Sequence, residues 1–453
     1  MTSMENNRLY DLVIIGAGPG GYVAAERAGS KGKKVLLVEK ADLGGICLNA
    51  GCIPSKTLIN SGKLFSQACN SDIYGVTVEN PSFDLTKAMA YKQKVIKTLR
   101  NGVGFQMKQR QVDIITGEAS FIDQRTIQVN GDQYQAENVI IATGASPVLP
   151  PISGLDEAHV VTSKEILEVE KLPNHLVVIG GGAIGCEFAS FFSNVGVQVS
   201  LIEILPEIIS PLDSELAGML RKSIKGVNFH LESKVERIAT NSVVYSQNGE
   251  SKNMSCDMVL VSVGRKPNVE GLGLENIDID FDQHGIKVNQ IMQTNIPHIY
   301  AVGDVTGTSM LAHSASRMGE VAVRNMSGEQ DTMRYHAIPW VVYTNPEAAW
   351  VGMTEAEAKD KGIPVKTAKL PMNANGRFLV ENSGKRGICK VVVDAQTDLL
   401  LGVQMVGAIC SEIIYGAAAM IEDEFRVQDI KDVIFPHPTV SEIFKDTLYY
   451  LPA

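Results

Sequence analysis

Leu12–Gly21 reads LVIIGAGPGG, an apolar run that ends in a glycine-rich turn. An alanine-rich stretch with a helical pattern follows, and then a second apolar run, Val35–Val38, which ends at Glu39. Strand, glycine turn, helix, strand and acid in this order are typical of a dinucleotide-binding unit. The glycines would let the backbone approach a pyrophosphate at the helix N-terminus, and the acid could accept hydrogen bonds from ribose hydroxyls. The glycines of this motif are Gly16, Gly18 and Gly21.

The same unit recurs later in the chain. Leu176–Ile179 leads into a second glycine turn, and Val197–Ile202 ends at a second acid, Glu203. Five positions repeat with one constant offset of 164 residues: Gly16 and Gly180, Gly18 and Gly182, Gly21 and Gly185, Gly32 and Gly196, Glu39 and Glu203. Two unrelated turns would not match in register at five positions. We therefore predict two dinucleotide sites, and two such cofactors in one chain suggest electron transfer between them.

The residues around each acid indicate which cofactor each site takes. Glu203 would repel a 2′-phosphate, and Ile204–Pro206 offers no arginine to bind one, so the second site is predicted to take NAD rather than NADP. Only five residues after Glu39 the chain enters Gly44–Lys56, which reads GGICLNAGCIPSK. A flavin at the first site would lie with its ring near these cysteines, so we predict FAD there.

Cys47 and Cys52 are the candidate reactive groups of that stretch. Pro54 predicts a helix that begins there, with Cys52 just outside its N-terminus. The helix dipole would favour a thiolate at Cys52 below the usual thiol pKa of about 8.5. Residues five apart are not neighbours on a regular helix, so a disulfide needs irregular backbone, which Asn49 and Gly51 permit because both tolerate positive φ. Two buried structural cysteines, or half of a metal site, are the alternatives.

The composition narrows the classes of function. The chain has 453 residues, 45% of them apolar, which is enough for several domains with large cores. Its net charge of −10 disfavours nucleic acid as the main partner. No apolar run reaches the roughly 18 residues that a membrane span needs. The first residues, MTSMENNRLYDLVIIG, lack a basic stretch before an apolar one, so we expect no export signal and a cytoplasmic location, where a disulfide is more often catalytic than structural.

Further motifs along nearly the whole chain carry a family resemblance. Besides the two glycine turns and GGICLNAGCIPSK, they are VIIATGASP at 139–147, SVGRKPN at 262–268, IYAVGD at 299–304, MLAH at 310–313 and HPTVSE at 437–442. With them the chain resembles the disulfide-dependent flavoprotein reductases, the class I pyridine nucleotide-disulfide oxidoreductases, and among these the dihydrolipoamide dehydrogenases. The resemblance implies an α/β fold with two Rossmann-like domains, for FAD and NAD, and an α+β C-terminal dimerisation domain. The implied divisions are 1–153 for FAD, 154–270 for NAD, 271–335 for a central segment that completes the FAD domain, and 336–453 for dimerisation.

The resemblance also implies roles for single residues. Cys52 would be the thiol next to the flavin and Cys47 the thiol that exchanges with substrate, which agrees with their places relative to the helix start. Lys56 would pair with Glu187 beside the flavin, and His437, oriented by Glu442, would be the base that enters the active site of the other subunit. Without the resemblance, Lys56 would be interpreted as a solvated lysine and His437 as a structural histidine. The remaining implied contacts are Ala119, Asp304 and Ala312 with FAD, and Val235 and Gly264 with NAD.

The implied activity is the oxidation of protein-bound dihydrolipoamide to lipoamide, with the electrons passing through the disulfide and FAD to NAD⁺. The implied partners are a second copy of the chain and the lipoyl domain of an acyltransferase or H-protein, in a 2-oxo acid dehydrogenase, acetoin dehydrogenase or glycine cleavage system. No metal is expected. Four residues at three sites depart from the family pattern and bear on substrate preference and pH optimum: Ile46, Ala183 and Phe435-Pro436.

Rival functions within the same fold are each disfavoured by a residue. A mercuric reductase needs a C-terminal cysteine pair, and the last cysteine here is Cys410. A glutathione reductase would favour NADP, which Glu203 opposes. A thiol-independent transhydrogenase would lack Cys47 or Cys52. A non-catalytic docking subunit, a function of another class, would not need the complete set of catalytic candidates.

Overall fold

The computed structural model describes residues 9–452, so the expectation about an export signal, which concerns the first residues, lies outside the described part. The chain forms two compact units. Unit 1 contains residues up to 57, 89–148 and 264–334, and unit 2 contains 58–88, 149–263 and the residues from 335 on. These breaks lie near the predicted boundaries at 153, 270 and 335, except that 58–88 groups with unit 2. The four-part division stays a prediction.

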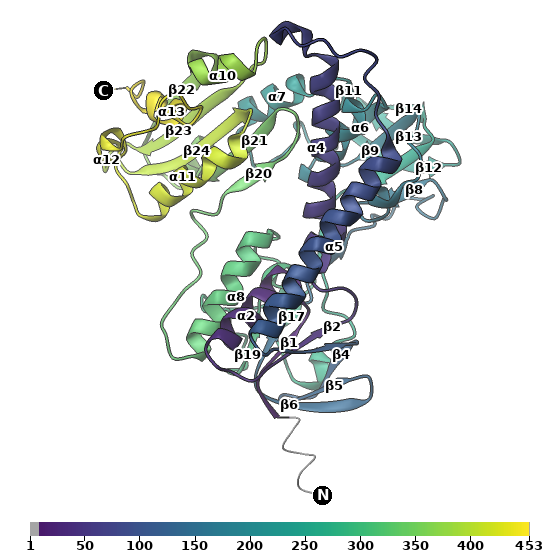
Figure 1. The fold of residues 1–453 in the computed structure, drawn as a ribbon, viewed down its shortest axis with the longest axis vertical. Helices are drawn as coiled ribbons and strands as arrows, with labels where there is room; N and C mark the ends of the chain where they lie inside the picture. Colours follow the sequence, from purple (N-terminus) through teal and green to yellow (C-terminus); the bar gives the residue numbers. More distant parts are fainter. Residues whose placement is uncertain (1–8, 453) are drawn as a thin grey trace, which may run out of the picture. The chain divides into compact units, whose positions relative to one another are not determined.

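Unit 1 is built around one mixed sheet (Figure 1). Its strands follow the order β3-β2-β1-β6-β5-β4, and β19 also pairs with β6. β1, β2, β3, β6 and β19 are parallel, whereas β4, β5 and β6 form an antiparallel meander. The bounds are β1 Leu9–Ile15, β2 Val35–Glu39, β3 Asp113–Thr116, β4 Ala119–Asp123, β5 Thr126–Val129, β6 Asp132–Ile141 and β19 Ile299–Ala301. The near-continuous apolar runs at β1, β2 and the end of β6 are buried, as strands of a covered parallel sheet must be.

Two helices of unit 1 pack closely because both carry small residues four apart. They are α2 (Pro19–Ser30), with Gly20 and Ala24, and α8 (Ala312–Met326), with Ala315 and Gly319. A Cβ added at Gly319 would lie 2.6 Å from the carbonyl oxygen of Gly20, so a larger residue there would force the helices apart.

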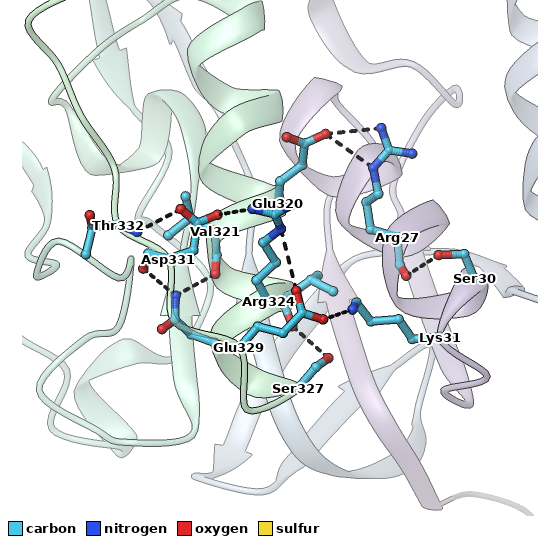
Figure 2. Close-up of polar contacts among 12 residues, drawn as sticks. Arg27, Ser30, Lys31, Glu320, Val321, Arg324, Ser327, Glu329, Asp331 and Thr332 are labelled. Carbon is cyan, nitrogen blue, oxygen red and sulfur yellow. Dashed lines mark hydrogen bonds and ion pairs between the residues drawn. The ribbon is translucent and has the colours of Figure 1, made fainter. Parts of the chain in front are cut away.

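Ion pairs join the C-terminal ends of the same two helices (Figure 2). Arg27 of α2 donates to Glu320 of α8 at 3.1 Å and 3.2 Å, and Lys31 pairs with Glu329. Arg324 pairs with both Glu329 and Asp331. The two pairs between the helices, Arg27 with Glu320 and Lys31 with Glu329, are solvent-exposed and contribute little alone, so the small-residue contact is the main constraint on this crossing.

The chain leaves unit 1 after Val148 and returns at Gly264 through one hydrogen-bonded crossing. β7 (Ala145–Pro147) pairs antiparallel with β16 (Arg265–Pro267), and the amide of Val148 donates to the carbonyl of Gly264 at 2.9 Å. The side chain of Asn268 donates to the carbonyl of Thr143 at 2.9 Å. The motifs VIIATGASP and SVGRKPN therefore meet here. The hairpin of β17 (Phe281–Asp282) and β18 (Gly285–Ile286), α3 (Gly45–Ala50) and most of α5 (Leu85–Gln109) complete this unit.

Unit 2 repeats the plan of unit 1 in its first part. A parallel sheet of order β11-β10-β9-β15-β8 is followed by an antiparallel meander, β12-β13-β14. The bounds are β8 Val160–Thr162, β9 His175–Ile179, β10 Gln198–Ile202, β11 Val227–His230, β12 Ser233–Ala239, β13 Ser242–Gln247, β14 Glu250–Ser255 and β15 Met258–Val261, with α6 Ala183–Asn194 and α7 Ser214–Ser223. The predicted repeat thus extends beyond the glycine turns to the order of the strands.

The C-terminal part of unit 2 is an antiparallel sheet of order β20-β21-β24-β23-β22 with helices packed on it (Figure 1). The bounds are β20 Trp340–Val342, β21 Glu347–Gly352, α9 Glu355–Asp360, β22 Val365–Pro371, α10 Gly376–Glu381, β23 Ile388–Asp394, β24 Leu400–Gly407, α11 Cys410–Glu422, α12 Val427–Asp432 and α13 Glu442–Leu448. The predicted fold class, α/β with two Rossmann-like units and an α+β C-terminal part, is confirmed. Among residues 9–452, no helix is long and apolar enough to cross a membrane.

A buried lysine joins the two parts of unit 2. Lys390 of β23 is 4% exposed and donates to Asp213, the N-cap of α7, at 2.8 Å and to Glu355 at 2.7 Å. Burial opposes the charge on both partners, but the hydrogen bonds and opposite charges outweigh it. The pKa of Asp213 is therefore lowered and the pKa of Lys390 is raised.

We expect Lys390→Met to lower the free energy of unfolding by about 2–4 kcal/mol at neutral pH, because it leaves a half-buried carboxylate unpaired. The exposed pair of Lys369 with Glu215 provides the control, and Lys369→Met should cost less than about 1 kcal/mol. The lowered pKa of Asp213 makes its contribution present above pH ~4 and lost as pH falls further. Thermal unfolding across pH should therefore show the deficit of Lys390→Met shrinking below pH ~4. An equal deficit in both variants would contradict this.

Candidate functional site

The two glycine turns have nearly the same backbone geometry. Gly16 and Gly180 open them with φ of +104° and +107°, a region that only glycine adopts readily. Gly18 and Gly182 then serve as N-caps of α2 and α6 with φ of −72° and −71°, and no side chain caps either helix. Both helices therefore present backbone N–H groups that are available to an anion.

The two acids, Glu39 and Glu203, make the same pair of hydrogen bonds. Glu39 accepts from the amides of Ala17 at 2.7 Å and Ala41 at 2.9 Å. Glu203 accepts from the amides of Gly181 at 2.5 Å and Leu205 at 2.8 Å. An ionised carboxylate has about four acceptor positions, so each acid keeps capacity for ribose hydroxyls while the backbone holds it in place.

The glycines differ in what surrounds them. A Cβ at Gly21 would lie 1.8 Å from the carbonyl oxygen of Gly16, and one at Gly185 would lie 2.0 Å from that of Gly180. In contrast, a Cβ at Gly18 would meet only the Cα of Gly45, at 3.9 Å, and one at Gly182 would meet nothing within 4 Å. The third glycine of each turn is thus needed by the protein's own packing, whereas the second faces room that a pyrophosphate would fill.

Cys47 and Cys52 form a disulfide, with their Cα atoms 4.7 Å apart. Cys47 lies within α3, and Cys52 is the first residue of α4 (Cys52–Cys69), so this helix begins two residues before the predicted start at Pro54. The irregular backbone lies at Gly51, with φ −148° and ψ −110°. The predicted irregularity between the cysteines is thus present at Gly51, although positive φ occurs at Gly44 and Gly45 and not at Asn49 or Gly51. Asn49 is helical, and its side-chain amide donates to the carbonyls of Leu43 and Gly45.

Asp304 lies in unit 1 at the end of β19, beside the end of β6. Burial raises its pKa, and the guanidinium of Arg265, 3.7 Å away, partly opposes that rise. A half-buried carboxyl with one loose partner fits an acceptor for the hydroxyls of a cofactor. Ala119 begins β4 and Ala312 begins α8, both in unit 1.

The other predicted residues are divided between the units. Lys56 lies in unit 1 and Glu187 in unit 2, so their pairing stays a prediction. Glu187 is buried, not at the surface, and accepts from the amide of Tyr343 at 3.0 Å. Val235 packs its side chain in the core of unit 2 and pairs with Tyr245 of β13, so its contact with NAD stays a prediction. Gly264 has φ +129° at the crossing between β7 and β16.

His437 and Glu442 are hydrogen-bonded in unit 2. His437 Nδ1 is 3.0 Å from Glu442 Oε1, and the amide of Thr439 donates to Glu442 Oε2 at 2.9 Å. The bonds from Thr439 and His437 lower the pKa of Glu442, so it stays ionised at neutral pH. A carboxylate on Nδ1 favours the tautomer whose Nε2 is free to accept a proton. The imidazole is 82% exposed, so a reacting group can reach it.

Comparison with known proteins decides the family. Residues 10–319 match the model described as pyridine nucleotide-disulphide oxidoreductase, and residues 338–448 match its dimerisation domain. Dihydrolipoyl dehydrogenase of Geobacillus stearothermophilus is 41% identical over 444 residues, covering 96% of this chain and 94% of the relative. The chain is a pyridine nucleotide-disulphide oxidoreductase. A dihydrolipoyl dehydrogenase of Thermus scotoductus is also 41% identical, with 96% of both chains covered.

Solved structures agree with this oxidoreductase family. The HOCl-induced flavoprotein disulfide reductase RclA from Escherichia coli superposes with a TM-score of 0.87 at 30% identity, covering 97% of this chain and 99% of that one. LpdA from Mycobacterium tuberculosis gives 0.89 at 25% identity, covering 97% and 98%. The predicted cofactor pair, FAD and NAD(H), is thereby confirmed as that of the family.

The departures from the family pattern lie in three separate segments of this oxidoreductase. Ile46 is 47% exposed beside Cys47, and Ala183 is the first residue of α6. Phe435 packs edge-on against Phe444 of α13, with ring centroids 6.4 Å apart. An aromatic anchor thus precedes His437 on the loop that carries it.

Sequence reasoning missed Arg265, the partner of Asp304, and Arg100, which bonds to Asn49. Arg265 stood inside the quoted SVGRKPN motif, so it could have been singled out. Arg100 lies 51 residues from Asn49 with no motif around it, so no local signal indicated it. Within residues 9–452, no three His, Cys, Asp or Glu side chains are placed to hold a metal.

We call each glycine turn, together with the helix start and the acid that flank it, a cradle: the first contains Gly16 and Glu39 and the second contains Gly180 and Glu203. The second cradle allows a test with two matched variants. We expect Gly182→Ala to keep normal thermal stability and FAD content but to raise the KM for NAD⁺, because its Cβ meets no protein atom and would occupy room left for the pyrophosphate. Gly185→Ala should lose both NAD⁺ binding and stability, because its Cβ overlaps the carbonyl of Gly180. Steady-state kinetics for the KM, calorimetry of NAD⁺ binding and thermal unfolding check this. An unchanged KM in Gly182→Ala would place the pyrophosphate elsewhere.

Proposed function

We propose that this oxidoreductase oxidises dihydrolipoamide carried by a partner protein to lipoamide and reduces NAD⁺ to NADH. The observation that carries the proposal is the Cys47–Cys52 disulfide at the start of α4, in the same unit as the first dinucleotide cradle. The names of the two bacterial relatives support dihydrolipoamide as the substrate. The uncharged side chains that follow Glu203 support NAD over NADP.

The proposed roles of the residues follow from their positions. A thiolate of dihydrolipoamide attacks the sulfur of Cys47, the Cys47–Cys52 bond breaks, and Cys52 leaves as a thiolate favoured by the N-terminus of α4. The second substrate thiol then attacks the mixed disulfide, which releases lipoamide and leaves both cysteines reduced. His437 accepts the proton through Nε2 while Glu442 holds its other nitrogen.

The cofactors would be held by the two cradles. Gly16, Gly18, Gly21, Glu39 and Asp304 would hold FAD, and Gly180, Gly182, Gly185 and Glu203 would hold NAD. When bound, FAD supplies the two-electron step between the dithiol and the nicotinamide. Lys56 and Glu187 would set the local charge near the flavin.

The chain carries the dimerisation domain of the family. We further propose a C2 homodimer in which His437 serves the disulfide of the other subunit. The strong exposure of the imidazole supports this arrangement. The partner would be a lipoyl domain of an acyltransferase or H-protein. The enzyme would work in the cytoplasm, where a disulfide is more often catalytic than structural.

The deciding assay compares two reactions of the purified enzyme. We expect NAD⁺ reduction by dihydrolipoamide to exceed NADPH-driven reduction of glutathione disulfide by orders of magnitude, because Glu203 opposes a 2′-phosphate. Faster glutathione reduction would reject the proposal.

The proton-transfer role of His437 can be tested alone. His437→Gln should reduce dihydrolipoamide turnover about 10²- to 10⁴-fold, the range for loss of a general base. Reduction of bound FAD by NADH should survive, since that step needs no substrate thiol. His284→Gln, at an exposed histidine of unit 1, is the control and should turn over normally. Normal turnover in His437→Gln would remove this residue from the mechanism.

Electron counting tests the redox role of the disulfide. Anaerobic titration of the wild-type enzyme should take up four electrons per subunit, two by the disulfide and two by FAD. Cys47→Ser should take up two, because only the flavin remains. An uptake of two electrons by the wild-type enzyme would show that the disulfide does not take part.

A further inference from the structure

The short helix that carries Cys47 has little stability of its own. α3 spans six residues, begins after the left-handed Gly44 and ends at the irregular Gly51. Helices much shorter than about 12 residues are marginal in water without outside contacts. The placement of Cys47 therefore depends on what holds α3 to the rest of unit 1.

Asn49 supplies the first of these contacts. Its side-chain amide nitrogen donates to the carbonyl of Leu43 at 3.0 Å and to that of Gly45 at 2.9 Å. It lies two residues after Cys47 and three before Cys52. One side chain thus connects the segment between the cysteines to the turn that precedes α3.

Arg100 holds Asn49 from a long helix of the same unit. Its Nε and terminal nitrogen donate to Asn49 Oδ1 at 3.0 Å and 2.8 Å, and its other terminal nitrogen pairs with Asp42 at 2.8 Å. A planar guanidinium can make such parallel bonds, and a lysine cannot. Arg100 therefore holds both ends of the segment 42–49 at once.

α5 is a firm base for this arginine. It runs for 25 residues and buries Ile96, Val103 and Met107. A Cβ at Gly104 would lie 3.7 Å from Leu43, so α5 also packs on the turn before α3. The connection from α5 through Arg100 and Asn49 to the cysteines lies wholly in unit 1.

We propose that Arg100 is a positioning residue for the redox disulfide: through Asn49 it keeps Cys47 close to Cys52 in the dithiol state. Holding two thiols together raises the effective concentration of one at the other and so favours the disulfide. Loss of Arg100 frees α3 when the bond is open, which favours the dithiol. Arg100 contacts no reacting atom and acts through Asn49, while its ion pair with Asp42 holds the guanidinium in place.

The test measures the dithiol–disulfide equilibrium of the holoenzyme. Each variant is equilibrated without oxygen in mixtures of reduced and oxidised dithiothreitol, quenched in acid and alkylated, and mass spectrometry of the 47–52 peptide gives the disulfide fraction. Dithiothreitol gives up two electrons and two protons and forms its cyclic disulfide, while the Cys47–Cys52 bond opens to two thiols. Arg100→Met should shift the equilibrium about 3- to 10-fold toward the dithiol, where tenfold corresponds to about 30 mV.

Matched variants separate this role from a general loss of stability. Arg110→Met removes another arginine of the α5 region, one that pairs with Glu26 at 2.8 Å, and should leave the equilibrium unchanged. Arg100→Lys keeps a charge beside Asp42 and should shift the equilibrium as Arg100→Met does. If Arg100→Met does not fold, Arg100→Lys takes its place in the test. Asn49→Ala combined with Arg100→Met should shift it no further than Asn49→Ala alone, because both act along one path.

Three results would overturn the proposal: an unchanged equilibrium in Arg100→Met, an equal shift in Arg110→Met, or wild-type behaviour of Arg100→Lys. The inference rests on the proposed redox role of the disulfide, but the two fail differently. Absent dihydrolipoamide turnover in the wild-type enzyme would contradict the proposed function. An unchanged dithiothreitol equilibrium in Arg100→Met, with normal wild-type turnover, would contradict this inference alone.

Discussion

A break in the backbone at Gly51 is the constraint on which the reactive centre depends. Cysteines five apart cannot meet on one regular helix, and here one helix ends and another begins between them. A Cβ at Gly51 would lie 2.9 Å from the carbonyl oxygen of Ile46, so the close return of the chain requires glycine. This break lets Cys47 bond to Cys52 at the first turn of α4, where the helix dipole favours a thiolate.

The cradles are suited to bind cofactors because no side chain caps the N-termini of α2 and α6. α2 and α6 begin at glycines with no capping side chain, which would be a defect in an ordinary helix. The same unpaired amides are what a pyrophosphate needs. Glu39 and Glu203 each fix the neighbouring glycine turn by accepting hydrogen bonds from two backbone amides. The repeated geometry therefore explains why one chain can hold two dinucleotides in the same manner.

Long-range contacts hold these elements where the chemistry requires them. Lys390 connects the N-cap of α7 to the C-terminal sheet of unit 2, and Gly20 and Gly319 allow α2 and α8 to pack closely in unit 1. Arg100 of α5 likewise holds α3 in place through its hydrogen bonds to Asn49. For α3, a long helix carries a charged residue to a segment that is too short to order itself.

The sequence by itself determined the two dinucleotide units and the fold class, because these signals are local: glycines at fixed spacing and an acid at a strand end. The pairs Cys47–Cys52 and His437–Glu442 came from the family resemblance, because their spacing alone left other interpretations open. Only the tertiary structure decided where α4 begins, that Glu187 is buried against the amide of Tyr343, and that Arg100 reaches Asn49. Such contacts join residues that the chain separates by 51 positions or more. Their energies depend on how sheets and helices pack, and no short pattern records that packing.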